Sequence, residues 1–279
     1  MTDPAPRRPR AWLQPLAATL AAAVPLAPLV IALLLNGGGA PARATASTTR
    51  FSPVGASRPA AQTGPRVPPG SAAQTGPRLP PGSGALVALV DQRTQMRAAP
   101  GGRVIAAVPI RTMFGSPEAM WVRRLSGRWL GVVSVLAGNK RLGWIPQSDV
   151  TLSRVDWELR VSLSAHRLTV LENGRTVRRY RVAIGAPASP TPTGRFAVTD
   201  RLSTGNPAGP YGCCILALSA TAPHAIQGWD GGNRIAIHST PESSTIGEAV
   251  SHGCVRLTLA EGRWLLMHIP LGTPTVVSS

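Results

Sequence analysis

The sequence predicts a mainly β protein with one or two short helices, in which two folded domains follow an N-terminal targeting segment and a linker. Short apolar runs of strand length recur from residue 85 onward, separated by glycine, proline and asparagine turn signals. A helix start signal followed by an apolar run occurs clearly near the C-terminus. The length of 279 residues is enough for about two domains.

The first 36 residues resemble an export signal. Arg7, Arg8 and Arg10 precede a stretch without charged residues, 11–35, that is longer than a secretory signal core and long enough to span a bilayer. We favour an uncleaved signal anchor behind a short cytoplasmic stub over a signal peptide cleaved in the small-residue tract 42–46. Either form places the rest of the chain outside the cytoplasm, in the periplasm or wall space, and the anchor would hold it at the cytoplasmic membrane.

A linker rich in Gly, Ala, Pro, Ser and Thr is expected over residues 37–84. It contains a near-exact duplication, in which residues 60–71 recur as 72–83 with Leu79 in place of Val67. The apolar content is too low to bury a core, so we expect an extended, mobile segment that holds the folded part away from the membrane.

Residues 85–153 are predicted to form a small all-β domain. Leu86–Val90, Arg103–Val108 and Trp129–Val135 are apolar runs at strand length, bounded by turn residues. The segment from Arg128 to Val132, followed by Gly143 to Pro146, resembles the end of bacterial SH3-like domains, which are small β-barrels. Such a domain would bind the cell wall or serve as a structural spacer, and the sequence does not separate the two.

Residues 154–279 are predicted to form a second, mainly β domain. Leu159–Leu163 and Arg167–Leu171 alternate apolar and polar residues, as half-buried strands do. Asn173-Gly174 then predicts a hairpin turn into a third strand, Val177–Gly185. Thr258-Leu259-Ala260-Glu261 is a capping box that predicts the start of a helix.

The charge of the chain is strongly positive but not concentrated in one block. Lys+Arg 29 against Asp+Glu 12 gives a net charge of +17, spread over both the N-terminal part and the folded domains. Such a field favours anionic surroundings, among them anionic cell wall polymers and phospholipid head groups. Only 4% of residues are aromatic and no nucleic-acid-binding motif is present, so we expect no nucleic acid partner.

Cys254 and His238 are the residues that predict chemistry. A cysteine has a pKa near 8.5, so it needs a histidine within hydrogen-bond reach to take its proton, which would give an imidazolium–thiolate pair. Gly253 directly before the cysteine lets the backbone aim successive N–H groups at one point, as an oxyanion hole requires. Nucleophile, base and oxyanion hole together are what acyl transfer needs.

The pattern around these residues resembles the L,D-transpeptidase (YkuD-like) catalytic domain. His238-Ser239-Thr240, then Ile246-Gly247, then Ser251-His252-Gly253-Cys254-Val255-Arg256 match the signature of that family in order. Further agreement lies in residues 185–196 and 270–274.

This resemblance covers residues 158–277 and implies a β-sandwich-like catalytic domain that acts on peptidoglycan stem peptides. Cys254 would attack the carbonyl between the third residue, a diamino acid, and the terminal D-Ala of a tetrapeptide stem. The amine of a second stem would resolve the thioester and give a 3→3 crosslink, without any cofactor or metal.

The resemblance also implies roles for the neighbouring residues. Ser239 would orient His238 through its backbone, while His252 and Gly253 would frame the oxyanion site with Cys254. Three further residues are candidates for substrate binding: Tyr211, Arg256 and Ser251, of which Ser251 is favoured as structural and Arg256 stands where many members have Asn.

Several alternatives remain open at this stage. The same pair of residues would also suit an L,D-carboxypeptidase that uses water as acceptor, and the chain would otherwise be a catalytically idle wall-binding protein. Zinc held by His238, His252 and Cys254 is disfavoured, because the spacing is unusual and no CxxC accompanies it. Cys213 and Cys214 would be two small buried hydrophobes, which we favour, or a vicinal disulfide.

Overall fold

A computed structural model describes residues 79–223 and 232–279. Within this part the protein is mainly β, with seventeen strands, one α-helix and three short 3₁₀ helices. The fold class predicted from the sequence is confirmed at this level. The predicted targeting segment and most of the linker lie outside the described residues. No helix in the described part is long and apolar enough to cross a membrane.

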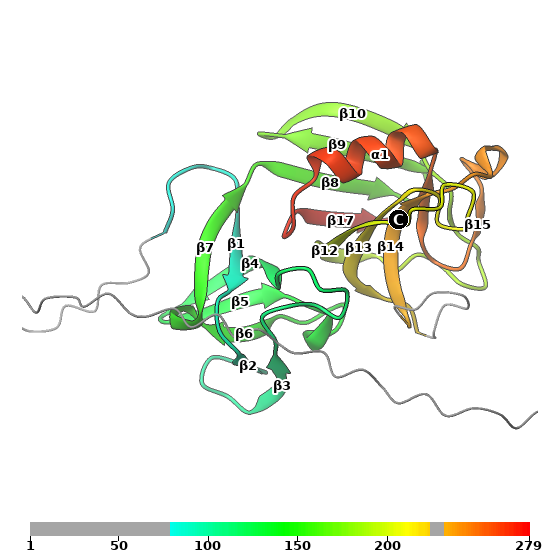
Figure 1. The fold of residues 1–279 in the computed structure, drawn as a ribbon. Coiled ribbons are helices and arrows are strands. Elements are labelled where there is room, and N and C mark those ends of the chain that lie inside the picture. Colours follow the sequence, from blue (N-terminus) through cyan, green and yellow to red (C-terminus); the bar gives the residue numbers. More distant parts are fainter. Residues whose placement is uncertain (1–78, 224–231) are drawn as a thin grey trace, which may run out of the picture. The chain divides into compact units, whose positions relative to one another are not determined.

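The first sheet is antiparallel, has seven strands and spans residues 85–155 (Figure 1). Its edge strands are β3 and β7, and β1 lies between β4 and β7, with Val155 at the end of β7 opposite Ala85. Its core contains Met96, Leu130 and Ile145, all fully buried. The SH3-like assignment of this region stays a prediction. In sheet order the strands are β3 (Val104–Val108), β2 (Thr94–Arg97), β6 (Gly143–Pro146), β5 (Trp129–Val133), β4 (Ala119–Ser126), β1 (Ala85–Val90) and β7 (Val150–Val155).

The second sheet has eight strands, and β12 joins its two halves. The first residues of this long strand pair with β17, and the residues from Val198 onward pair with β13. In sheet order the strands are β10 (Arg175–Arg181), β9 (Arg167–Glu172), β8 (Trp157–Ser162), β17 (Pro274–Ser278), β12 (Gly194–Ser203), β13 (Cys214–Thr221), β14 (Arg234–Ser239) and β16 (Val255–Leu257). The short strands β11 (Ile184–Gly185) and β15 (Ala249–Ser251) form a separate parallel pair.

Two local signals in the sequence produce the structure they predict. Asn173 and Gly174 have φ of 50° and 74° and connect β9 to β10, as a two-residue hairpin turn requires. Thr258 accepts a hydrogen bond from the Glu261 amide, and the Glu261 carboxylate accepts one from the Thr258 amide, at the start of α1 (Leu259–His268). This helix packs against β13 and β14.

The predicted third strand, Val177–Gly185, is wrong as a single element. The Val182 amide still donates to the carbonyl of His166, which precedes β9, but the chain then leaves this pairing because Ala183 exchanges hydrogen bonds with Arg256. It then forms β11 beside β15, where the Ala186 amide donates to the Ser251 carbonyl. This change of partner brings the β11 segment next to the loop that precedes Cys254.

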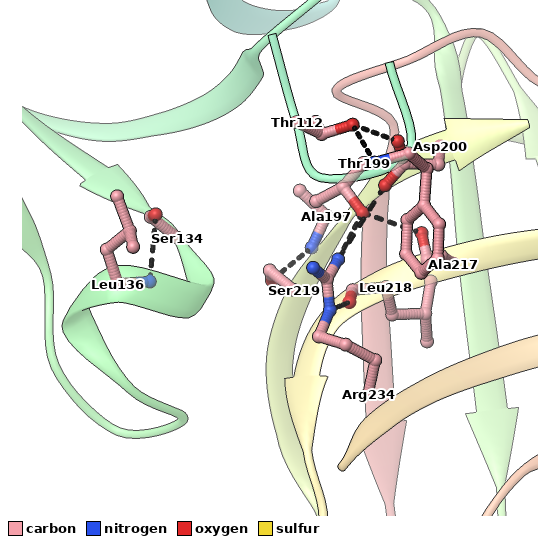
Figure 2. Close-up of polar contacts among 11 residues, drawn as sticks. Thr112, Ser134, Leu136, Ala197, Thr199, Asp200, Ala217, Leu218, Ser219 and Arg234 are labelled. Carbon is pink, nitrogen blue, oxygen red and sulfur yellow. Dashed lines mark hydrogen bonds and ion pairs between the residues drawn. The ribbon is translucent and has the colours of Figure 1, made fainter. Parts of the chain in front are cut away.

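A buried group of charged side chains links the two sheets. Asp200 on β12 is fully buried and accepts a hydrogen bond from Thr112, in the connection between β3 and β4 (Figure 2). Arg234 at the start of β14 donates to the Leu218 carbonyl over 2.9 Å and lies 3.8 Å from the Asp200 carboxylate. Glu118, 7% exposed, is close enough to both for its pKa to respond to their charges. Arg234 begins β14, and His238 lies near the other end of the same strand.

Candidate active site

Two neighbouring parallel strands bring the nucleophile and the base together. Cys254 directly precedes β16, and His238 is the penultimate residue of β14. In the pairing of these strands Ile237 lies opposite Val255 and His238 opposite Arg256. The register therefore places Cys254 beside Ala236, whose amide donates to the Cys254 sulfur over 3.4 Å. The Ala236 amide is a functional contact that sequence reasoning missed, because no side chain signals it.

The turn before Cys254 depends on glycine. Gly253 has a φ of 112°, where other residues are strained, and an added Cβ would lie 2.9 Å from the Ile235 side chain. The buried hydroxyl of Ser251 ties the turn together: it donates to the Cys254 carbonyl over 2.6 Å and accepts from the Gly253 amide over 3.1 Å. His252, between them, is exposed. Ser251 thus fixes the shape of the turn. The Gly253 amide is already engaged in this hydrogen bond.

The tautomer of His238 follows from one hydrogen bond. Its Nδ1 lies 2.8 Å from the backbone carbonyl of Ser239. A carbonyl oxygen only accepts, so Nδ1 carries the proton and Nε2 keeps its lone pair. The base nitrogen therefore faces away from Ser239 with its lone pair available to take a proton.

The electrostatics of the site favour neutral groups. Burial, with a smaller effect of the positive charge of Arg256, lowers the pKa of His238 from 6.5 to about 4, although hydrogen bonds to the backbone of Ser239 and Tyr211 oppose this shift. Burial raises the pKa of Cys254 from 9.0 to about 11, while the Ala236 hydrogen bond and Arg256 oppose the rise. Both groups are then neutral at pH 7. These pKa shifts favour neutral side chains in the resting protein over the imidazolium–thiolate pair expected from the sequence, because the two side chains are only 2% and 5% exposed.

Ser239 connects the base to a neighbouring loop. Its hydroxyl accepts a hydrogen bond from the Cys214 amide over 3.1 Å and lies 3.4 Å from the Cys213 sulfur. Cys213 and Cys214 form a disulfide, so the favoured expectation of two reduced hydrophobes is wrong. The Tyr211 ring packs edge-on against His238, with 4.9 Å between ring centroids. This loop therefore contacts the base through Tyr211 and the residue after the base through Cys213 and Cys214.

Arg256 lies beside the reacting pair with unsatisfied hydrogen-bonding capacity. Its Nη1 is 3.9 Å from the exposed Glu242 carboxylate, and its buried Nε has no hydrogen-bond partner. The side chain is 20% exposed, so part of it is accessible to solvent. An anion near Cys254 would satisfy it.

The structure thus brings together seven of the eight residues chosen from the sequence and leaves His252 facing solvent. No three His, Cys, Asp or Glu side chains in the described ranges lie close enough to hold a metal ion. The arrangement provides a thiol, a neutral imidazole with a free lone pair, a glycine turn and a cation. These are the parts that acyl transfer through a thioester uses.

Comparisons with known proteins identify the same region. The family model "YkuD: L,D-transpeptidase catalytic domain" matches residues 156–277. YkuD of Bacillus subtilis is 32% identical over 124 residues, which cover 44% of this chain and 67% of that protein. YqjB of the same organism is 30% identical over 129 residues, covering 42% and 69%. L,D-transpeptidase 1 of Mycobacterium tuberculosis is 33% identical over 127 residues, covering 42% of this chain but only 48% of that protein.

A solved structure gives a weaker likeness. The crystal structure of an L,D-transpeptidase from Mycobacterium tuberculosis aligns with a TM-score of 0.38 and 21% identity, covering 50% of this chain and 72% of that one. At this TM-score the family assignment rests on the family model and the sequence relatives alone.

Proposed function

The chain belongs to the L,D-transpeptidase catalytic-domain family, and from this premise we propose that it is a peptidoglycan transpeptidase that forms 3→3 crosslinks through a thioester on Cys254, with His238 as general base. The observation that supports this most is the placement of the thiol and the imidazole on paired strands, with the Nε2 lone pair of His238 left available. The chain spans about two thirds of the Bacillus relatives and about half of the mycobacterial one.

In the first step the sulfur of Cys254 attacks the carbonyl carbon between the diamino acid and the terminal D-Ala of a tetrapeptide stem. Nε2 of His238 takes the thiol proton as the S–C bond forms. Because the resting thiol has a pKa of about 11 and the imidazole one of about 4, proton transfer accompanies attack and no free thiolate precedes it. The tetrahedral species then expels D-Ala, whose nitrogen takes the proton from His238, and the thioester remains.

In the second step the side-chain amine of another stem attacks the thioester. Its nitrogen loses a proton to His238, an amide bond forms and the thiol is restored by that proton. One acyl bond replaces another, so the reaction needs no nucleotide.

The neighbouring residues have roles in this proposal that follow from their contacts. The Gly253 amide is occupied by Ser251, so we assign the oxyanion site to the remaining amides of the turn, from His252 and Cys254. Arg256 would bind a carboxylate of the stem, and Tyr211 would line the substrate groove beside His238.

The setting of the reaction is also part of the proposal. An N-terminal anchor would hold the enzyme at the cytoplasmic membrane and place the folded part in the periplasm or wall space. The first domain, residues 85–153, would be an SH3-like module that contacts the wall.

The test is product analysis by mass spectrometry after incubating the full-length chain with a disaccharide tetrapeptide. We expect a crosslinked dimer that has lost one D-Ala, absent with Cys254→Ala and His238→Ala. His268→Ala is the matched control, because His268 is exposed and stacks on Trp264 outside the site, and it should keep the activity. Stem shortening without a dimer would favour a carboxypeptidase, and unchanged substrate with every protein would favour an idle wall-binding protein.

A further inference from the structure

A groove lined by basic side chains lies away from the candidate active site. It has a volume of about 730 Å³ and runs between β4 and β6 on one side and the adjoining ends of β12 and β17 on the other. Five positively charged residues line it, and no acidic residue does. We call it the basic groove, and its charged residues are Arg123, Arg124, Lys140, Arg141 and Arg195.

These charges have no counterion among the residues that the structure describes. None of the five takes part in an ion pair of the described chain. Burial, and then the positive charges of Arg195 and Arg124, lower the pKa of Arg123. Like charges held this close repel one another, and a bound anion would relieve that repulsion.

The groove adjoins another hollow. This second hollow has a volume of about 530 Å³ and shares Arg123, Arg195 and Val276 with the basic groove. Two acidic residues, Asp156 and Glu158, line this second hollow, and Glu158 is paired with Arg160. The shape suits an extended chain better than a single small anion.

Aromatic rings supply apolar wall next to the charges. Trp144 on β6 lies against Gly131, where an added Cβ would be 3.1 Å from its ring, so the glycine makes room for it. The guanidinium of Arg123 lies 4.9 Å from the centroid of the Trp121 ring, which restricts its position. The carbon units of a polymer can pack on such surfaces while its charged groups meet the arginines.

We propose that the basic groove binds a linear phosphodiester polymer, an anionic cell wall polymer with polyol or sugar units between its phosphates. Four of the five cations are arginines, whose planar fork matches phosphate oxygens with two hydrogen bonds. A peptidoglycan stem is a poorer occupant, because its diamino acid would bring an ammonium group among five cations with no acidic partner. Such binding would hold the catalytic domain in the wall independently of its chemistry.

The test is fluorescence anisotropy of a labelled glycerol phosphate hexamer titrated with the full-length chain. The test variant carries Arg124→Ala, Arg141→Ala and Arg195→Ala. The control variant carries Arg167→Ala, Arg175→Ala and Arg179→Ala, which removes the same charge from exposed positions of the β9–β10 hairpin.

We expect the groove variant to bind at least about tenfold more weakly and the hairpin variant to lose less than about threefold. The negative slope of log affinity against log salt concentration should become less steep by about 2 in the groove variant, since each lost phosphate contact reduces its steepness by about 0.7. Cys254→Ala should bind like the wild type, which separates this site from the proposed catalysis.

Three outcomes would overturn the proposal. Equal losses in the two variants would mean that only the net charge matters. Tighter binding of an oligoglutamate of equal charge would point to carboxylates, and tighter binding of an oligonucleotide with the same number of phosphates would point to nucleic acid.

Discussion

Replacing Glu118 by glutamine is expected to stabilise the folded protein above pH 7 and to leave its stability near pH 4 unchanged. Glu118 is 7% exposed and lies near the fully buried Asp200 and near Arg234, so two carboxylates share one guanidinium. Glutamine has the shape of the protonated acid and cannot ionise. The substitution therefore removes the charge of Glu118 and little else.

The size of the stabilisation expected for Glu118→Gln follows from the pKa of Glu118 in the folded and in the unfolded chain. Burial, and then the negative charge of Asp200, raise it from 4.5 to about 7 in the folded protein, while Arg234 lowers it in part. The unfolded chain loses the proton near pH 4.5 and the folded chain only near 7. The contribution of Glu118 protonation to the free energy of unfolding is therefore complete below pH 4.5 and is lost as the pH rises through 7. The loss at pH 8 is about 3 kcal/mol, because the pKa of Glu118 differs this much between the folded and unfolded chain.

The assay is urea unfolding of the full-length chain followed by tryptophan fluorescence at pH 4 and pH 8. Glu118→Gln should unfold at a higher urea concentration than the wild type at pH 8 and at the same concentration at pH 4. Glu248→Gln, at an exposed carboxylate, is the matched control and should change neither. A Glu118→Gln protein that is less stable at pH 8, or equally shifted at both pH values, would refute this account of the cluster.

Three further predictions concern the candidate active site. Alkylation of Cys254 by iodoacetamide, followed by mass spectrometry, should accelerate about tenfold per pH unit from pH 7 to 10, whereas a plateau in the neutral range would reveal a preformed ion pair. Gly212→Ala should cost about 1–3 kcal/mol in urea unfolding and lower turnover at least about tenfold, because φ is 56° and the new Cβ would lie 2.5 Å from the Ser239 hydroxyl; wild-type turnover would contradict this contact. Cys213→Ala/Cys214→Ala should change the unfolding free energy by only about 1 kcal/mol, because a bond between adjacent residues restrains little of the unfolded chain, and a much larger loss would show that the disulfide holds the core.

Features determined by neighbouring residues could be predicted from the sequence. The Asn173-Gly174 turn and the capping box of Thr258 depend on contacts within a few residues, and both are present. The pair of Cys254 and His238 was identified because its flanking residues form a specific motif. In each case the sequence contains both the signal and its partner.

Features that depend on distant contacts could not be predicted. The cluster of Glu118, Asp200 and Arg234 joins three separate elements, and no short motif marks it. The neutral state of the reacting pair depends on burial by the surrounding core. The continuous composition of Val177–Gly185 predicts one strand, but the hydrogen bonds of Ala183 with Arg256 and of Ile184 with Glu248 divide it.

The central claim, that Cys254 carries the acyl group, is tested most directly by intact-mass spectrometry of the full-length chain quenched in acid after mixing with a disaccharide tetrapeptide. The account predicts a covalent adduct with the mass of the substrate minus D-Ala, mapped to Cys254 by peptide digestion and absent from Cys254→Ala. An adduct on another residue, or crosslinked product formed by Cys254→Ala, would contradict it.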